Sequence, residues 1–308
     1  MTFNDLLSKK IGVLLGGKSR ERSTSLRSGA DVYRALLDIG FKDVVVIDLG
    51  DDPIAQITDS GIEFAFLALH GTDYEDGKLQ GALEMIGVPY TGCGVLASAV
   101  GFDKASAKIV ASGLGVPTPD WFLIEEFGQL DGLGFEGPYI AKPRAQGSSL
   151  GVQKVGSRAE LPKRIKLLFE EFGPVLIEKF IPGRDLTVGV IGDPGNIQVL
   201  PILEIITSAG IYDREGKFGD DTDYSAPAKI EERIRLRAEE YAKVIYGALQ
   251  CKAVSRLDFR LDGDWLYFLE INTIPGMNRS TSNMSRILSA AGIPYDDFVK
   301  KIILDSIS

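Results

Sequence analysis

The chain has 308 residues, of which 34 are Lys or Arg and 43 are Asp or Glu, so its formal net charge is −9 and its isoelectric point is near 4.9. Nucleic-acid phosphates are bound by clustered positive charge, so this acidic balance argues against a nucleic-acid partner. With 44% hydrophobic residues, 25% charged residues and a mean hydropathy of +0.06, the composition excludes a disordered or collagen-like chain and is typical of a globular protein.

Membrane-spanning and metal-cluster classes are also disfavoured. The longest apolar runs, such as residues 64–69, have strand length, whereas a membrane span needs about 20 residues. Residues 1–5 contain an early acid and lack the pattern of a signal peptide, which predicts a cytoplasmic protein. One histidine, His70, and two cysteines, Cys93 and Cys251, are too few for a histidine-rich zinc site. We expect the cysteines to be reduced core residues.

The first hundred residues alternate strand and helix patterns. Strand-like apolar runs occur at residues 10–17, 43–49 and 64–69, and a helical repeat covers residues 24–37. This alternation predicts an α/β domain with a parallel sheet. A further helix is expected over residues 103–112 before a breaker rich in Gly and Pro at residues 113–119, and we place a domain boundary near residue 100.

From residue 121 the pattern changes to short strands, which makes the C-terminal part α+β in character. Strands are expected at residues 139–143, 151–155, 175–180, 186–191 and 199–206, with a helix over residues 158–172. A long amphipathic helix follows at residues 230–249. Residues 254–261 and 265–271 then predict a hairpin around Asp262-Gly263-Asp264, and two helices end the chain.

Two glycine patterns imitate nucleotide-binding motifs. Residues 12–19 match the phosphate-loop spacing and end in Gly17-Lys18-Ser19. We interpret this segment as a strand because residues 13–15 are apolar, and a phosphate-loop kinase that uses Lys18 is the rival hypothesis. The pattern Gly92-x-Gly94-x-x-Ala97 imitates a dinucleotide fingerprint, but no acid follows at the expected distance. We interpret it as a turn.

A stronger phosphate-binding candidate follows the strand at residues 139–143. Lys142 ends this strand, and the loop at residues 144–152 contains two glycines beside Ser148 and Ser149. One ammonium group and several backbone amides can surround a polyphosphate in such a loop. A plain glycine hairpin with a solvated lysine is the alternative interpretation.

The C-terminal hairpin carries a candidate metal site. Charged and apolar residues alternate along residues 256–261, and a pairing that sets Asp258 opposite Glu270 also sets Arg256 opposite Asn272. Two carboxylates and an amide oxygen on one sheet face are hard oxygen ligands that suit Mg²⁺. Arg256 can neutralise charge that develops during phosphoryl transfer. An exposed ion-pair ladder is the alternative, but a sharp turn containing Gly276 follows directly, and it allows close approach of the backbone to a ligand.

At this point the chain resembles a known family. The hairpin, the lysine loop and the segment from Glu178 to Asp185 resemble the ATP-grasp fold, and the chain as a whole resembles the D-alanine–D-alanine ligases. The motifs that carry the resemblance occur in family order: Gly16-Gly17-x-Ser19-x-Glu21-Arg22, Leu69-His70-Gly71, Glu75-Asp76-Gly77, Pro89-Tyr90-Thr91-Gly92, Asp103-Lys104, Tyr212-Asp213 with Lys217, and Glu270-x-Asn272-Thr273-x-Pro275-Gly276-Met277.

The resemblance implies an ADP-forming ligase of three parts: residues 1–102 for substrate, 103–186 for the central ATP-grasp subdomain, and 187–308 for the C-terminal subdomain with the metal site. ATP would lie between the last two parts. The nucleotide-binding residues would be Lys104, Lys142, Ser148, Ser149, Glu178, Lys179, Phe180, Ile181, Asp185 and Lys217. Two Mg²⁺ ions, or Mn²⁺, would be held by Asp258, Glu270 and Asn272. Asp185 would lie at the ribose, where the family usually has Glu.

The resemblance also implies the reaction. The carboxylate of one amino acid attacks the γ-phosphate, and the amine of a second then attacks the acyl phosphate. Arg256 and the Gly276 amide would stabilise the oxyanion, and Ser148 and Lys217 would belong to the catalytic set. His70 would lie near the first amino acid, and a homodimer through the N-terminal domain is expected.

Departures from the family pattern concern the substrate. Ser23 stands where we expect the acid that binds the first ammonium, and Phe218 replaces an expected Tyr. Residues Arg279, Ser280, Thr281 and Ser282 replace the stretch that receives the second carboxylate. Drift within true D-alanine–D-alanine ligases, with Asp73 as a compensating acid, is one explanation. A ligase for other amino or hydroxy acids in secondary metabolism, or an inactive nucleotide-binding relative, remains an alternative.

Overall fold

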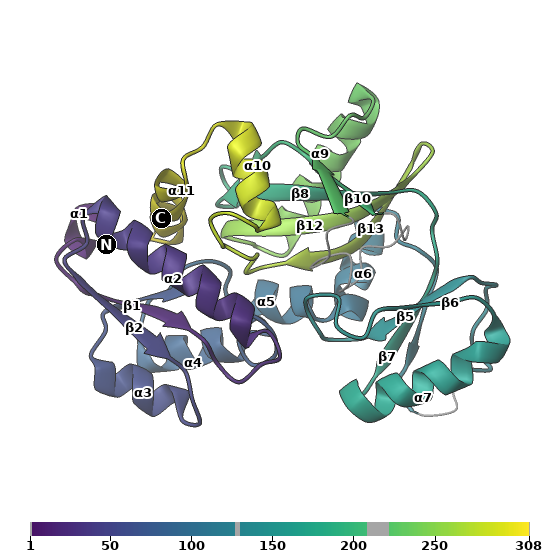
Figure 1. Cartoon of the computed structure of the whole chain (residues 1–308), viewed down its shortest axis with the longest axis horizontal. Coiled ribbons are helices and arrows are strands. Elements are labelled where there is room, and N and C mark those ends of the chain that lie inside the picture. The colour runs from purple at the N-terminus through teal and green to yellow at the C-terminus, as the bar shows by residue number, and fades with distance from the viewer. Residues whose placement is uncertain (1, 127–129, 208–221, 308) are drawn as a thin grey trace.

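The computed structural model describes residues 2–126, 130–207 and 222–307, and Figure 1 shows their arrangement. The N-terminal part contains a parallel sheet in the order β2-β1-β3. Its strands are β1 (Lys10–Leu15), β2 (Asp43–Asp48) and β3 (Phe64–Leu67). Its helices are α1 (Phe3–Leu6), α2 (Arg22–Ile39), α3 (Pro53–Ser60), α4 (Lys78–Ile86) and α5 (Val95–Phe102). The predicted α/β alternation with a parallel sheet is confirmed.

The central part is a four-stranded antiparallel sheet in the order β4-β7-β5-β6. It lies at the right of Figure 1, with α7 on its outer side. Its elements are α6 (Lys104–Gly113), β4 (Trp121–Ile124), β5 (Tyr139–Pro143), β6 (Gln153–Val155), a 3₁₀ turn (Arg158–Glu160), α7 (Leu161–Phe172) and β7 (Val175–Lys179). The amphipathic face of α7 buries Leu161, Ile165 and Leu168 against this sheet.

The C-terminal part is a second, largely antiparallel sheet in the order β11-β10-β8-β12-β13, with β9 paired to β8. Its elements are β8 (Arg184–Gly192), β9 (Gln198–Val199), β10 (Leu203–Thr207), β11 (Thr222–Ser225), α9 (Glu232–Ala248), β12 (Ala253–Asp262), β13 (Trp265–Asn272), α10 (Asn283–Ala291) and α11 (Tyr295–Ile307). The single strand predicted over residues 199–206 is wrong, because β9 ends at Val199 and β10 begins at Leu203.

Two observations refine the predicted division of the chain. The predicted boundary between residues 186 and 187 falls inside β8, so we propose that the central part ends near Gly183 instead. The C-terminal helix α11 packs against α2, and Phe298 and Ile302 join the core of the N-terminal sheet (Figure 1). The first and last parts therefore share one apolar core. Among the described helices, none is long and apolar enough to cross a membrane.

The glycine patterns are not ligand loops in this structure. Gly12 lies within β1, residues 11–15 are buried, and exposed Lys18 forms an ion pair with Asp51. The interpretation as a strand is confirmed, and no feature of this segment supports a phosphate-loop kinase. Gly92 has the positive φ of 91° that a turn requires, but the turn interpretation missed α5, which begins directly after Gly94.

Candidate active site

A cavity lies between the β5–β7 sheet and the β12–β13 hairpin. It brings together most of the residues with a predicted nucleotide or metal role, although they come from segments far apart in the sequence. Its lining includes Lys104, Lys142, Ser148, Ser149, Glu178, Lys179, Phe180, Ile181, Asp185, Arg256, Asp258, Glu270 and Asn272. The two sheets thus form opposite walls of one site.

The hairpin has the predicted register. Arg256 pairs with Asn272 and Asp258 pairs with Glu270, so all four side chains lie on one face. The Arg256 guanidinium donates to both Asp258 oxygens, with Nε 3.0 Å from Oδ1 and Nη2 2.8 Å from Oδ2. Thr187 Oγ1 on β8 donates to Asp258 Oδ1 at 2.8 Å. This carboxylate is therefore held firmly in the cavity wall.

Glu270 and Asn272 complete the set of oxygen ligands. Burial alone would raise the pKa of Glu270, but the cations Lys104, Lys142 and Arg256 outweigh burial and lower it to about 2. Lys104 Nζ lies 3.1 Å from Glu270 Oε2. The Asn272 orientation that satisfies both amide atoms donates from its nitrogen to Glu75 Oε1 at 3.0 Å and to the Ile274 carbonyl at 3.1 Å, so its oxygen points away from these two acceptors.

The ligand types fit a magnesium ion that also binds phosphate. Within residues 2–126, 130–207 and 222–307, no group of three or more His, Cys, Asp or Glu side chains could hold a metal. Two carboxylates and one amide oxygen are too few to fill an octahedron, so phosphate oxygens and water have to supply the remaining ligands. This is the pattern of a cation that binds together with a nucleotide.

The loop after β5 folds over this cavity. Ser148 and Ser149 both have positive φ angles, 51° and 54°, which non-glycine residues rarely adopt. Lys104 Nζ donates to the Gln146 carbonyl at 2.6 Å, and Arg144 Nε donates to Asp103 at 2.6 Å. The loop is thus tied to the start of α6, and both Ser148 and Ser149 line the cavity.

The segment after β7 is held by Arg260 of β12. Its Nε donates to the Ile181 carbonyl at 3.0 Å, and its Nη1 lies 2.7 Å from Asp185 Oδ2. Burial raises the pKa of Asp185, although Arg260 opposes this effect. Lys154 lies over the Phe180 ring at 3.8 Å from the centroid. The predicted adenine and ribose segment is thereby fixed at the cavity wall.

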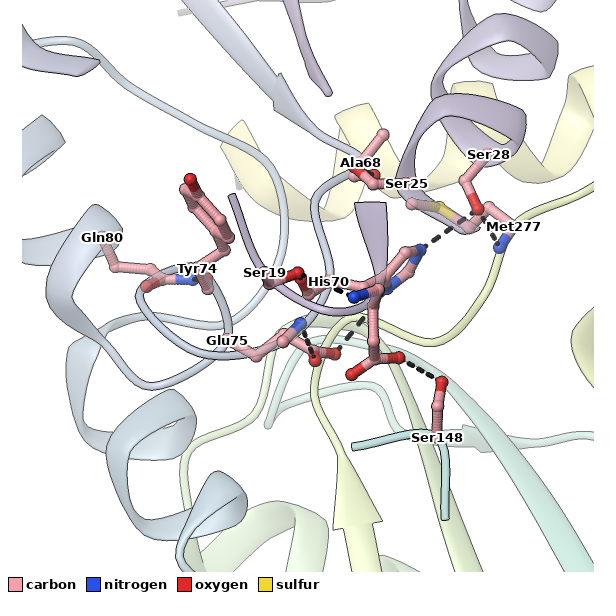
Figure 2. A network of polar contacts seen from close by, with 12 residues as sticks. Ser19, Ser25, Ser28, Ala68, His70, Tyr74, Glu75, Gln80, Ser148 and Met277 are labelled. Atoms are coloured by element: carbon pink, nitrogen blue, oxygen red, sulfur yellow. Dashed lines mark hydrogen bonds and ion pairs between the residues drawn. The ribbon is translucent and has the colours of Figure 1, made fainter. Parts of the chain in front are cut away.

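His70 does not line the cavity itself but belongs to a buried network that reaches the cavity at Glu75, which Figure 2 shows. Its Nε2 is 3.1 Å from Ser28 Oγ, and its Nδ1 is 3.8 Å from Glu75 Oε1. Glu75 accepts from the Gly71 amide at 2.6 Å, and the Met277 amide donates to Ser28 Oγ at 3.2 Å. Through Ser28, the histidine is linked to the segment that follows the hairpin.

Further hydrogen bonds keep the His70 segment rigid. Ser19 Oγ donates to the His70 carbonyl at 2.5 Å, and Ser25 Oγ donates to the Ala68 carbonyl at 2.9 Å (Figure 2). Tyr295 Oη donates to the Met277 carbonyl at 2.6 Å, which fixes the segment around half-buried Gly276 from the other side. The N-terminal part and the C-terminal part therefore hold each other in register at this point.

The first-substrate prediction at Ser23 requires correction. Ser23 is exposed on the first turn of α2, whereas Glu21, the residue that precedes this helix, is buried. Ser148 Oγ donates to Glu21 Oε2, and the Glu21 carboxylate leaves no room for a Cβ at Gly147. The acid at the serine loop is thus present. The suggested substitute, Asp73, is exposed and forms an ion pair with Lys78 at 2.6 Å.

The residues from Arg279 to Ser282 make contacts with Asn278 and with the helices α10 and α11. Arg279 forms an ion pair with Asp296 and lies 4.7 Å from the Tyr295 ring centroid. Ser280 and Thr281 both donate to Asn278 Oδ1, and Ser282 caps α10. None of these four lines the cavity. Lys217 and Phe218, as well as Tyr212 and Asp213, lie outside the described residues.

Three buried residues of the site were missed by the sequence analysis: Glu21, Glu75 and Lys108. Glu21 and Glu75 lie within the family motifs, and Lys108 lies within the predicted helix over residues 103–112, so the sequence alone gives none of them a separate role. A buried charged residue is rare unless it is paired. The burial of these three side chains and the partners that neutralise them are visible only in the three-dimensional structure.

Comparisons with known proteins agree with this geometry. Residues 114–304 match the family model "D-ala D-ala ligase C-terminus" and residues 50–93 match "D-ala D-ala ligase N-terminus". The D-alanine–D-alanine ligase of Carboxydothermus hydrogenoformans is 39% identical over 96% of this chain and 97% of that protein. That of Bordetella pertussis is 40% identical over 96% and 95%.

Solved structures are similar over the whole length as well. The D-alanine–D-alanine ligase from Bacillus anthracis complexed with ATP superposes with a TM-score of 0.83 at 31% identity, covering 97% of this chain and 98% of that chain. The VanG D-Ala:D-Ser ligase from Enterococcus faecalis gives a TM-score of 0.82 at 27% identity, covering 96% and 98%. The fold is therefore the α/β ATP-grasp fold.

Proposed function

The chain belongs to the D-alanine–D-alanine ligase family, and we propose that it joins two D-alanine molecules with hydrolysis of ATP to ADP and phosphate. The observation that carries this proposal is the buried Glu21 carboxylate beside Ser148 at the edge of the cavity. A carboxylate at this place is suited to bind the ammonium group of an amino acid. The substrate departures at Ser23 and Arg279 no longer point to another substrate, because Ser23 is exposed on α2 and Arg279 forms an ion pair with Asp296.

The nucleotide would lie between the two sheets. Lys142 and Lys104 would bind its phosphates, with the amides and hydroxyls of Ser148 and Ser149 above them. Lys179, Phe180 and Ile181 would contact the adenine, and Asp185 the ribose. Asp258, Glu270 and Asn272 would hold Mg²⁺, which neutralises phosphate charge when it is bound. The structure of the related D-alanine–D-alanine ligase from B. anthracis has been solved with ATP. The similarity of the two folds supports this placement of the nucleotide.

The reaction requires positioning and charge stabilisation rather than a nucleophile from the chain. The first D-alanine, oriented by Glu21 and the His70 network, attacks the γ-phosphorus through its carboxylate, the bond to the β-phosphate oxygen breaks, ADP leaves, and an acyl phosphate forms. The amine of the second D-alanine then attacks the acyl carbon, and phosphate leaves. The oxyanion that forms in between would be stabilised by Arg256 and the Gly276 amide.

A direct assay tests the proposal. The protein is incubated with Mg²⁺, ATP and D-alanine, ADP release is followed by a coupled assay, and the product is identified by mass spectrometry. We expect one ADP per D-alanyl-D-alanine formed and no dipeptide from L-alanine. D-serine and D-lactate are added as alternative second substrates. A folded protein that binds ATP but releases no ADP with any of these acids would contradict the proposal and support the inactive relative.

We further propose that the protein acts in the cytoplasm, where ATP is available, as a homodimer. Met85 at the end of α4 is 91% exposed, and Leu96 on the adjacent α5 is 54% exposed. Exposed apolar side chains of this kind can pair with those of a second copy across a two-fold axis. Light scattering should give the mass of a dimer for the unmodified chain and of a monomer for Met85→Glu. Leu167→Glu on the exposed side of α7 is the control and should leave the dimer intact.

A further inference from the structure

Two lysine side chains meet at one carboxylate oxygen in the wall of the cavity. Lys108 Nζ and Lys142 Nζ both lie 2.8 Å from Glu178 Oε1. The Lys108 side chain, which projects from α6, is 0% exposed, and its Nζ is also 3.4 Å from the Phe268 carbonyl. The mechanism proposed above uses Lys142 for the phosphates but gives no role to Lys108.

The two lysines differ in their access to a ligand. Lys142 and Glu178 line the cavity, whereas Lys108 does not, so it contacts Glu178 from the protein interior. Burial lowers the pKa of Lys108 to about 8, although the charge of Glu178 opposes this effect. Burial would raise the pKa of Glu178, but the two lysines outweigh it and lower it. At neutral pH the group therefore contains two cations and one anion.

This arrangement contains one cation more than Glu178 needs. We propose that Lys108 is a positioning residue, the resident counter-ion of Glu178, which allows Lys142 to transfer its charge from Glu178 to the nucleotide phosphates. The inference rests on the proposed function, because it assumes that the cavity binds a nucleotide.

The physical reason is the cost of an unpaired buried charge. If Lys142 turns towards a phosphate, Glu178 keeps Lys108 and stays neutralised. Without Lys108, the same movement would leave the Glu178 carboxylate buried without a cation, which is strongly unfavourable. Lys142 would then remain on Glu178. Phosphate binding should therefore suffer, whereas contacts to the nucleoside should be affected much less.

The test compares a ligand with phosphates and one without. Dissociation constants of Mg-ADP and of adenosine are measured by calorimetry, and their ratio reports the contribution of the phosphates. We expect Lys108→Met to reduce the preference for Mg-ADP over adenosine by about tenfold, which corresponds to ~1.4 kcal/mol. Lys163→Met, a change of an exposed lysine on α7, is the matched control and should leave the ratio unchanged.

The double variant Lys108→Met/Glu178→Gln separates charge compensation from a purely structural role. It buries no unpaired charge, so Lys142 is free for the phosphates and the ratio should return to that of the unmodified chain. If Lys108→Met alone does not fold, the double variant still tests the inference. A preference for Mg-ADP over adenosine that is reduced about tenfold in the double variant would overturn the inference. An unchanged ratio in folded Lys108→Met would overturn it as well. No preference of the unmodified chain for Mg-ADP would overturn the proposed function too.

Discussion

Replacement of Arg256 by methionine is expected to lower kcat by about 10²- to 10³-fold, the usual cost of losing one group that stabilises an oxyanion. Arg256 is 8% exposed and fixed by hydrogen bonds to both carboxylate oxygens of Asp258, so its charge does not need to reorganise when an anion forms. Such a fixed charge acts more strongly on the transition state than on the substrates. The KM values for ATP and for D-alanine should therefore change much less than kcat.

Two control variants separate this role from the loss of an ion pair. Arg184 on β8 forms a similar two-point pair with Glu204, with both distances 2.6 Å, but it does not line the cavity. Arg184→Met should keep kcat near that of the unmodified protein. Arg256→Lys keeps the charge but loses the planar fork, and it should be intermediate. The assays use saturating Mg²⁺, and equal loss of kcat in Arg184→Met and Arg256→Met would refute the assigned role.

The metal site illustrates what sequence alone can provide. In the register set by the Asp262-Gly263-Asp264 turn, Phe259 pairs with Phe268. If this ladder continued without interruption, Asp258 would pair with Leu269. A bulge between Asp258 and Phe259 shifts the register by one residue, and Asp258 pairs with Glu270 instead. The alternation of polar residues predicted this pairing correctly. The bulge itself was not predicted, because the turn sequence alone gives the uninterrupted register.

The position of the first-substrate acid shows where sequence reasoning fails. Glu21 directly precedes α2 and is buried, whereas Ser23 lies on the first turn of the helix and is exposed. Only one of them can face the serine loop. The contact that decides between them joins Glu21 to Ser148, 127 positions later in the chain. No local pattern contains this information, because the packing of two different sheets creates the contact.

The buried trio at Glu178 was beyond prediction for a related reason. Lys142 and Glu178 lie on adjacent strands of one sheet, but Lys108 comes from α6 and reaches the same oxygen from the opposite side. In the sequence, its helix position is equally consistent with a solvated face. The strands and helices follow from local periodicity, whereas the partner of a buried charge depends on tertiary packing.

Glu21→Gln is expected to raise the KM for the first D-alanine and to reduce kcat/KM by about ten- to a hundredfold, the range that follows from 1.5–3 kcal/mol for a charge-assisted hydrogen bond. The glutamine side chain keeps the size of glutamate and can still contact Ser148, so the loop should keep its conformation. The dissociation constant of Mg-ADP should remain unchanged, because Glu21 does not line the nucleotide cavity.

Variants of Ser23 provide the opposing test. Since Ser23 is exposed, Ser23→Ala and Ser23→Glu should leave the KM for D-alanine unchanged. A lower KM in Ser23→Glu would mean that the acid is missing from its place, and the assignment of Glu21 would fall. If Glu21→Gln leaves the KM unchanged while the protein still forms dipeptide, the ammonium group must be bound elsewhere. The KM for D-alanine should therefore rise in Glu21→Gln and stay unchanged in the Ser23 variants. Only this combination is consistent with an ammonium-binding carboxylate that reaches the serine loop from the start of α2.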